Sequence, residues 1–450
     1  MGIPVQETGG RMTALAIDAG SRYVRLARVA PGGPEPVELP GAVPGEGLPV
    51  PEAARGDRAA ALRTAYDTYL RHHDAPARLL VVVPQHDRAG HARRAADALA
   101  TPPARGPAPD VRTLATPHAV LALLRHTGGL APGRYAVCDL GAAAAEVAVC
   151  TVTPGAVAVA AASRHTSDDG YGDGFDAALL TRSGLTPDDD TRRALAAVRA
   201  EPGAGRRLAL VLDRAARDPA RFETTAVHHV AGRPVTAGTL RAALPLLTDG
   251  LDRALADALG PGRTAPLALT GGVARFGPLR PHLDAAGLPL TALPDGTDPA
   301  HTAVLGAALV AAGRVDPADR YPYELWIGAH RTEAGRPADR ELLISAAGTL
   351  EPGGPPVYAE DGGRRVGVRT APGRPVRVRV TDPASGAGTP LGPLTLPGGG
   401  ETDRFHVGVR LAVDGTAALI LHPLGAGPPG AFPLGTLPAD IGTDSKEVGP

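Results

Sequence analysis

Residues 14–29 read ALAIDAGSRYVRLARV, and residues 134–149 read RYAVCDLGAAAAEVAV. In each stretch, two mostly apolar runs flank a short turn that contains glycine, which predicts a β-hairpin. The first strand of each hairpin ends near an aspartate, Asp18 or Asp139, directly before the turn. Two similar hairpins in one chain predict an α/β domain with a duplicated design.

The residues of the two turns suit phosphate binding. Small residues at 19–21 and 141–142 let backbone N–H groups approach phosphate oxygens. An aspartate at the end of the preceding strand can hold a hydrated Mg²⁺ ion opposite them. Asp and Gly also occur in ordinary hairpin turns, so one such turn alone is weak evidence. The pair, in one domain, is stronger evidence for a site that binds phosphate groups.

The apolar periodicity predicts further elements around the hairpins. The Gly- and Pro-rich residues 31–51 favour a loop. We expect helices at 57–73, 91–100, 117–125 and 239–259, the last bent at Pro245, and strands at 79–83 and 267–269.

The pattern changes near Glu324, where helical periodicity gives way to short alternating runs. Valines at 376, 378 and 380 and the residues 405–411 alternate with period two, and Asp414-Gly415 is typical of a hairpin turn. We therefore expect an α/β domain at 13–313, a linker at 314–323, an all-β sandwich at 324–424 and a flexible Gly- and Pro-rich tail at 425–450.

The composition narrows the function classes. The chain has 450 residues, 43% hydrophobic and 21% charged, which is typical of a soluble globular protein with two or three domains. Aromatic residues make up only 3% and the net charge is −1, so nucleic-acid binding is not expected. Cys138 and Cys150 form neither a disulfide framework nor a zinc site, so we expect buried thiols in a reducing compartment. The sequence has no long apolar run, so we expect a cytoplasmic protein without a membrane partner.

Further motifs follow the hairpins in the order found in one family. They are LLVVVPQHDRAGHARRAADAL at 79–99, GYGDGFDAALL at 170–180, LALTGGVARFGPL at 267–279 and DPAHTAVLGAALVAAG at 298–313. With the two hairpins, they resemble the phosphate, connecting and adenosine motifs of the heat shock protein 70 chaperones. The residues 358–370, 389–398 and 406–421 resemble strands of that family's peptide-binding domain. The resemblance implies a two-lobed, actin-like ATPase (ribonuclease H-like) domain followed by a β-sandwich, without the family's helical lid.

The resemblance also implies a role for individual residues, with ATP or ADP and Mg²⁺ as ligands. Asp18 and Asp139 would face the Mg²⁺ ion and act in catalysis. The other residues that it assigns to the nucleotide are Gly20, Ser21, Arg22, Gly141 and Ala142 in the turns, Gly172, Asp173 and Asp213 toward the ribose, Arg217 near the adenine ring, and Gly271, Gly272 and Arg275 in the adenosine turn.

Simpler roles are available for several of these residues. Arg217 on a helix can be a surface charge, and Asp173 can cap the helix that follows. Gly271-Gly272 can form a plain turn after a strand. Asp176 favours an interaction with the helix dipole over a ligand role.

The sequence departs from the family where hydrolysis is performed. Ala142–Ala144 replace a glycine run and a threonine, and Thr116 aligns with a glutamate. Lys446 is the sole lysine of the chain, so the family's catalytic lysine has no counterpart. The residues 30–79 are also too few for the whole upper subdomain of the first lobe. Phosphoryl transfer depends on positioning and charge, so these losses predict slow or absent hydrolysis.

We therefore expect a chaperone-like protein that binds ATP and is at most a slow ATPase, with peptide or unfolded clients on its β-domain. The alternative is a nucleotide-free pseudo-ATPase that acts as an interaction scaffold. An active ATPase that uses Arg in place of lysine is a third hypothesis. A sugar or acetate kinase is a more distant fourth, because the β-domain has no role in one.

Overall fold

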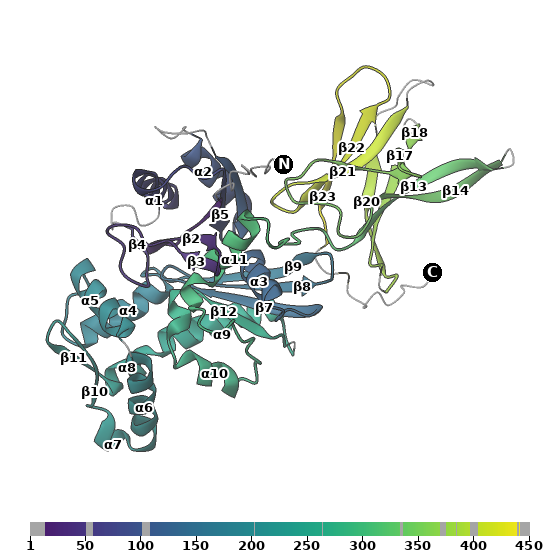
Figure 1. Cartoon of the computed structure of the whole chain (residues 1–450). Coiled ribbons are helices and arrows are strands. Elements are labelled where there is room, and N and C mark those ends of the chain that lie inside the picture. Colours follow the sequence, from purple (N-terminus) through teal and green to yellow (C-terminus); the bar gives the residue numbers. More distant parts are fainter. Residues whose placement is uncertain are drawn as a thin grey trace, which may run out of the picture. The chain divides into compact units, whose positions relative to one another are not determined.

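The computed structural model of the chain describes residues 14–50, 57–100, 109–201, 203–262, 264–333, 336–369, 375–383, 385–396, 404–438 and 441. They form a mixed α/β structure that divides into two compact units (Figure 1). The first unit comprises Met1–Val149 and Ala161–Pro317, and the second comprises Cys150–Ala160 and Ala318–Pro450. The segment Cys150–Ala160, which the sequence analysis includes in the first domain, is thus grouped with the second unit.

The first sheet of the first unit contains the predicted N-terminal hairpin. Its strands are β1 (Ala14–Ala19), β2 (Tyr23–Ala30), β3 (Gly33–Pro36), β4 (Leu48–Pro49), β5 (Arg78–Val83) and β6 (Asp110–Ala115). The order is β3-β2-β1-β5-β6, and β4 pairs with β2. β1 runs antiparallel to β2 and parallel to β5, and β5 runs parallel to β6. The loop expected at 31–51 is therefore wrong at β3 and β4, which both extend the sheet at β2.

The second sheet repeats this local design. Its strands are β7 (Gly133–Leu140), β8 (Ala145–Val152), β9 (Val157–His165) and β12 (Leu267–Thr270), in the order β12-β7-β8-β9. β7 and β8 form the second predicted hairpin, and β12 runs parallel to β7 with Thr270 opposite Asp139. Each sheet thus contains a hairpin whose first strand also pairs with a parallel strand from later in the chain. Cys138 and Cys150 are not joined in a disulfide, and both are buried in these strands, as predicted.

Four helices pack near the first sheet: α1 (Arg58–His72), α2 (Arg88–Leu99), α3 (Thr116–His126) and α11 (Thr302–Ala311). The Asp57 side chain accepts a hydrogen bond from Ala60 N and so caps α1. α1 buries Leu62 and Tyr66 in the same core as Leu15 and Ile17 of β1. α11 is buried over almost its whole length and packs against α3, β1 and β5.

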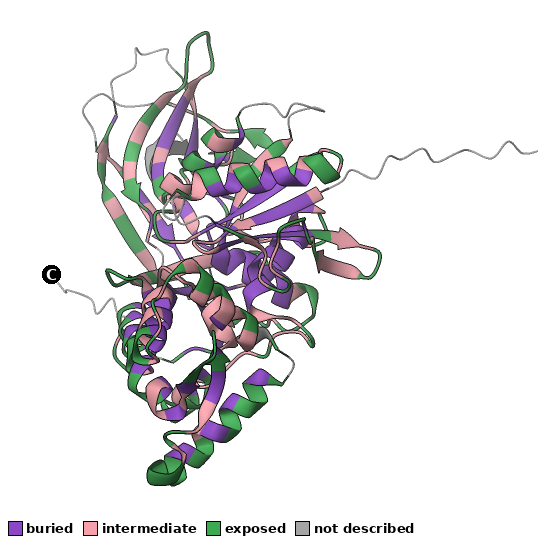
Figure 2. Ribbon diagram, turned by 90° about the vertical axis from the view of Figure 1, so that its left-hand side faces the viewer, coloured by how far each residue is buried: buried purple, intermediate pink, exposed green. Residues whose placement is uncertain are grey.

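The remaining elements of the first unit pack around the second sheet and its core. They are α4 (Tyr171–Arg182), α5 (Asp189–Ala200), α6 (Ala204–Arg217), α7 (Pro219–Phe222), α8 (Ala237–Ala243), α9 (Pro245–Leu259), α10 (Leu279–Ala285), the 3-10 helices η2 (Gly272–Arg275) and η3 (Pro299–His301), and the hairpin of β10 (Ala226–Val230) with β11 (Arg233–Thr236). The sequence predicts that Pro245 bends one long helix, but the structure has two helices there. Pro245 begins the second of them, α9, where its missing N–H group breaks no helical hydrogen bond. Figure 2 shows helices that are buried on one side and exposed on the other. In α6, Ala204, Leu208, Val211 and Ala215 form the buried side.

The second unit is rich in strands, as the period-two alternation predicts. The strands are β13 (Glu324–Glu333), β14 (Arg336–Ser345), β15 (Val357–Tyr358), β16 (Glu360–Asp361), β17 (Arg364–Arg365), β18 (Gly367–Val368), β19 (Pro375–Thr381), β20 (Gly388–Thr395), β21 (Phe405–Leu411), β22 (Thr416–Pro423) and β23 (Gly430–Thr436). One sheet has the order β14-β13-β19-β20, and another has the order β15-β21-β22-β23 with β18 paired to β21. Leu325 and Val380 from the first of these sheets share one hydrophobic core with Val409 and Leu419 from the second.

The last strand corrects one expectation from composition. The Gly- and Pro-rich stretch 425–450 is expected to be flexible, yet Gly430–Thr436 forms β23 and pairs antiparallel with β22. An edge strand tolerates Pro433 because it is paired along one side only. The residues 439–440 and 442–450 of the expected tail lie outside the described residues. No helix in the described part of the chain is both long and apolar enough to span a bilayer.

Candidate functional site

A cavity of about 1000 Å³ lies in the first unit, where the turns of the two hairpins come together. That volume is at the upper end of what small-molecule sites usually have. Most of the residues selected from the sequence line it. These are Asp18, Gly20, Ser21, Arg22, Asp139, Gly141, Ala142, Gly172, Gly271, Gly272 and Arg275.

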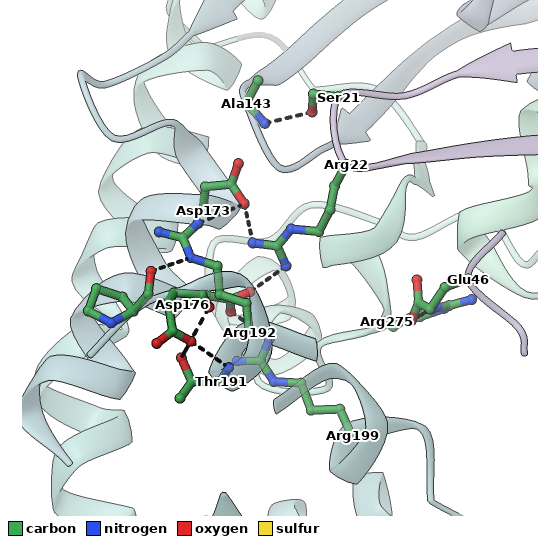
Figure 3. Close-up of polar contacts among 12 residues, drawn as sticks. Ser21, Arg22, Glu46, Ala143, Asp173, Asp176, Thr191, Arg192, Arg199 and Arg275 are labelled. Atoms are coloured by element: carbon green, nitrogen blue, oxygen red, sulfur yellow. Dashed lines mark hydrogen bonds and ion pairs between the residues drawn. The ribbon is translucent and has the colours of Figure 1, made fainter. Parts of the chain in front are cut away.

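The two turns are linked directly by a hydrogen bond. Ala143 N, in the second turn, donates to Ser21 Oγ, in the first, over 3.2 Å (Figure 3). Within the second turn, Gly141 N donates to Ala144 O over 2.9 Å. Both backbone N–H groups are therefore already paired in the structure, and a phosphate that bound to them would have to displace these bonds.

Asp18 and Asp139 face the same cavity and are only partly exposed. Burial raises the pKa of Asp139 to about 7, and the nearby carboxylates of Asp18 and Glu146 contribute in the same direction. Burial also raises the pKa of Asp18, although Arg25 and Arg58 oppose this shift. The two aspartates therefore form an electrostatically coupled pair that resists full ionisation on its own.

The donor set of this pair fits a magnesium ion. No cluster of three or more His, Cys, Asp or Glu side chains with metal-binding geometry occurs in the described ranges. Mg²⁺ does not need such a cluster, because it usually keeps several waters and binds one or two carboxylates together with substrate phosphates. Asp18 and Asp139 are the residues that would hold it, and a divalent cation between them would favour their ionised forms.

Two arginines that the sequence analysis missed also face the cavity. Arg58, at the start of α1, and Arg164, at the end of β9, line it, and among the described residues neither has a hydrogen-bond or ion-pair partner. Arg25, also in the lining, is 3.5 Å from Glu46 in an ion pair. Guanidinium groups recognise phosphate well because they present several fixed N–H donors. Arg58 favours the ionised forms of Asp18 and Asp139, and Arg164 favours that of Glu146.

Gly172 has a packing reason to be glycine. Its N–H group donates to Gly141 O over 3.3 Å, and Asp173 N donates to Ala142 O over 2.9 Å. A Cβ atom at Gly172 would lie 2.6 Å from Val273 Cγ2 and 3.0 Å from Gly141 O. The start of α4 therefore packs backbone to backbone on the second turn, and this contact alone accounts for the glycine.

Gly271 is constrained in the same way by the end of β7. Its φ of 91° lies in the region that favours glycine, and a Cβ atom there would lie 2.5 Å from Leu140 O and 2.7 Å from Asp139 Oδ1. This turn follows β12, and its close approach to Asp139 places the end of β12 at the cavity. A glycine is required at Gly271 whether or not a ligand binds.

A network of ion pairs connects the first hairpin to α4 and α5. Arg22 pairs with Asp173 and, over 2.6 Å, with Asp176, while Arg199 pairs with the other oxygen of Asp176 over 2.6 Å (Figure 3). Arg192 lies 3.4 Å from Asp173. Burial opposes the ionisation of Asp176, but Arg199 and Arg22 hold the pKa of this carboxyl below its ordinary value.

This network changes two expected roles. The guanidinium of Arg22 is engaged by carboxylates, and Asp173 pairs with arginines and does not line the cavity. Asp176, expected to interact mainly with the helix dipole, is a buried member of the network.

Arg275 is likewise held by acidic groups. Its guanidinium pairs with Glu46, donates to Gly45 O and forms two hydrogen bonds with Asp298, of 2.7 Å and 2.6 Å. Burial alone would raise the pKa of Asp298, but the neighbouring His301 and the hydrogen bonds from Arg275 hold it well below its ordinary value. The resemblance implies that Arg275 packs on an adenine ring, whereas here it joins η2 to the segment before β4.

The structure places Asp213 and Arg217 away from the cavity. They form a 2.8 Å ion pair with each other on α6, and their side chains are 51% and 77% exposed. The residues of α6 that do line the cavity are Ala204, Gly205 and Leu208, near its N-terminus. Both residues are thus surface charges outside the cavity lining, whereas the resemblance implies contacts with ribose and adenine.

Thr116, which aligns with a glutamate of the family, has a defined position in the structure. Thr116 lines the cavity, and its hydroxyl donates to Val83 O over 3.3 Å. Glu146 also lines the cavity. It is a buried carboxylate that was not among the candidate residues chosen from the sequence. Glu146 accepts hydrogen bonds from the backbone N–H groups of Gln85 and His86. Those bonds orient its carboxylate and leave it less free to act as a base.

Comparison with known proteins adds no assignment. No protein-family model matches the chain, and no curated protein matches it with significance.

Proposed function

We propose that the first unit is a nucleotide-binding domain with the two-lobed, actin-like fold of the heat shock protein 70 family. The observation that carries this proposal is the meeting of two Asp- and Gly-bearing hairpin turns at one cavity whose lining includes Arg58 and Arg164, which are unpaired among the described residues. The phosphates of ATP or ADP would lie near the turns, with Arg58 and Arg164 as counter-ions. Bound Mg²⁺, held by Asp18 and Asp139, would neutralise part of the phosphate charge.

Hydrolysis in this proposal is slow or absent. Arg58 and Arg164 supply positive charge, but the cavity has no lysine, and its Thr116 hydroxyl is directed to Val83 O. The methyl groups of Ala142 and Ala143 occupy the turn where the family has glycine. Binding and turnover therefore separate, because binding requires charge and shape, whereas turnover also requires a positioned nucleophile.

The second unit would act as the interaction module of a chaperone-like protein. Its support is the resemblance of 358–370, 389–398 and 406–421 to peptide-binding strands, together with the two antiparallel sheets that share a core. Peptide or unfolded segments are the partners that this proposal names.

A nucleotide-free scaffold is the second candidate, and specific contacts favour it. The Ser21–Ala143 hydrogen bond and the packing of Gly172 on Gly141 already use backbone groups of the second turn. In that case the cavity would be a remnant, and the ion pairs of Arg22 and Arg275 would hold it in one shape.

Isothermal titration of the full chain with ATP and ADP in the presence of Mg²⁺ separates the two candidates. We expect measurable binding that falls about tenfold or more in Arg58→Ala, because a charged hydrogen bond contributes about 1.5–3 kcal/mol. Arg63→Ala is the matched control, since Arg63 lies on the same helix and pairs with Asp67. A single-turnover assay on the same preparation should show little hydrolysis. No heat and no melting shift at millimolar nucleotide would favour the scaffold instead.

A further inference from the structure

His228 is a buried polar side chain that the proposed nucleotide site has not yet used. It lies on β10, is 5% exposed and lines the cavity. Neither of its ring nitrogens has a hydrogen-bond partner in the part of the chain that the structure describes. Buried polar groups are nearly always paired, so an imidazole in the wall of a cavity with two unpaired nitrogens indicates a missing partner.

Arg199 brings a second unpaired group to the same place. One terminal nitrogen, Nη1, pairs with Asp176 over 2.6 Å, while Nη2 is buried and lacks a partner among the described residues. The guanidinium lies 5.6 Å from the centre of the Phe175 ring, which fixes its plane against an aromatic face. Asp176 holds Nη1, so the N–H groups of Nη2 are the ones left without a partner among the described residues.

The walls around these two polar groups are mostly apolar. Phe175 and Leu208 are buried, and Phe276 lies with its ring centre 5.1 Å from that of Phe175. A Cβ atom at Gly205 would meet no heavy atom within 4 Å, so the first turn of α6 leaves space there. We call the end of the cavity formed by Phe175, Arg199, Gly205, Leu208, His228 and Phe276 the His228 pocket.

The protonation state of His228 restricts what can bind. Burial lowers the pKa of His228 to about 4, and Arg199 and Arg207 contribute in the same direction. At neutral pH the imidazole is uncharged, with one nitrogen as donor and the other as acceptor. A simple anion would pair with the donors and leave the acceptor unsatisfied. A planar heterocycle offers both donors and acceptors on its edge, and flat faces for the apolar walls.

We propose that the His228 pocket binds the heterocyclic base of a nucleotide, with His228 and Arg199 forming hydrogen bonds to the edge of the base. This inference rests on the proposed nucleotide-binding function and specifies where the base lies. The residues that the resemblance assigns to the base are not available for it, because Arg217 lies outside the cavity and Arg275 is held by Glu46 and Asp298.

The test compares ligands with and without a base. Isothermal titration of the full chain with ATP, GTP and inorganic tripolyphosphate, each with Mg²⁺, should show that at least one nucleotide binds about tenfold or more tightly than tripolyphosphate. His228→Leu should remove most of this advantage and leave the affinity for tripolyphosphate unchanged, since a lost hydrogen-bond partner costs about tenfold. His229→Leu is the matched control, because His229 is the exposed neighbour on the same strand and should change neither affinity.

The possible outcomes distinguish this inference from the proposed function. Nucleotide affinity that survives in His228→Leu overturns the His228 pocket and leaves nucleotide binding intact. An equal loss for tripolyphosphate also overturns it, because the effect would then lie outside base recognition. If the wild-type chain binds no nucleotide, both proposals fall. His228→Asn keeps a hydrogen-bond donor and an acceptor in a smaller side chain, so it should retain part of the nucleotide's tighter binding over tripolyphosphate. This variant replaces His228→Leu in the test if His228→Leu does not fold.

Discussion

Arg22 is the residue that connects the first hairpin to α4 through two ion pairs. It extends from the first hairpin turn and pairs with Asp173 and Asp176 on α4. The side chain of Asp176 is only 5% exposed, so it depends on its arginine partners to remain ionised. Losing one partner of a buried ion pair costs far more than losing an exposed one, because the remaining charge stays buried.

We expect Arg22→Met to lower the free energy of unfolding by about 3 kcal/mol, the usual range for a broken buried pair. Arg28→Met is the control on the neighbouring strand β2, since Arg28 pairs with Glu35 and both side chains are largely exposed. The control should lose less than about 1 kcal/mol. Denaturant unfolding of both variants measures the difference. Equal losses would show that the Arg22 network is no more important than a surface pair.

The raised pKa of Asp139 predicts an unusual dependence of the free energy of unfolding on pH. Its ordinary pKa is 3.8, and burial raises the pKa in the folded state to about 7. Between these values the folded state binds more protons than the unfolded state, so this group lowers stability as pH rises from about 4 to 7. Asp139→Asn cannot ionise. We therefore expect the variant to gain stability relative to wild type as pH rises, by a few kcal/mol, since each pKa unit corresponds to about 1.4 kcal/mol.

Denaturant unfolding of wild type and Asp139→Asn at pH 4 and pH 8, both in a metal chelator, tests this expectation. Comparing the two proteins at each pH cancels the contribution of titrating groups that do not interact with Asp139. A difference in unfolding free energy that does not change with pH would mean that Asp139 is solvated and ionises normally.

The sequence locates residues of the site only where a local signal exists. Asp18 and Asp139 are recognisable because each precedes a glycine-bearing turn, and both do line the cavity. Arg58, Arg164 and His228 have no such signal, because tertiary packing, rather than the residues beside them, brings them to the cavity. The same limit explains Arg275, whose partner Glu46 lies 229 residues away along the chain.

At the scale of elements, α11 and α3 are two buried helices of the first unit that pack closely against each other. Gly306 of α11 lies so close to α3 that a Cβ atom there would be 1.9 Å from Ala119 O. Both helices are buried over most of their length. The backbones therefore approach more closely than any residue with a Cβ atom would allow.

Two glycine-to-alanine changes in helices should have opposite effects on stability. Gly306→Ala should destabilise the protein by about 1–3 kcal/mol or more, because the added methyl group forces a backbone shift in a packed core. Gly205→Ala in α6 meets no atom within 4 Å and should be neutral or stabilise by up to about 1 kcal/mol through helix propensity. Melting temperatures of the two variants make the comparison. A stabilising Gly306→Ala would mean that α11 and α3 are farther apart.

Periodicity predicts elements well when one face is buried and poorly when the strand is short. The helices expected at 57–73 and 117–125 match α1 and α3 within two residues at each end. β3, β4 and β23 are missed because glycine and proline obscure their alternation, although neighbouring strands supply the hydrogen bonds that form them. Pro245 is similarly ambiguous, since the sequence cannot distinguish a bent helix from a new one.

At the scale of the whole molecule, the chain contains separate hydrophobic cores. In the first unit one core surrounds Leu15 and Tyr66, and another surrounds Leu179 and Leu251. The second unit has its own core, to which Val409 and Leu419 belong. The change from helical to period-two alternation near Glu324 predicts a change of architecture. It does not predict that Cys150–Ala160 is grouped with the second unit, because that requires a contact between segments far apart in the sequence.

The core of the second unit is separate from the two cores of the first unit. Differential scanning calorimetry should therefore resolve two unfolding transitions, one for each unit. Leu419 is fully buried, so Leu419→Ala should cost its unit about 2–5 kcal/mol and lower one transition only. Leu424→Ala is the matched control, because Leu424 is 47% exposed and should shift that transition little. ATP with Mg²⁺ at about 100 times its dissociation constant should stabilise the unit that binds it by about 2.7 kcal/mol and raise the other transition. If the nucleotide and Leu419→Ala both moved a single transition, the two units would unfold as one cooperative body, and nucleotide binding would be energetically coupled to the β-rich unit.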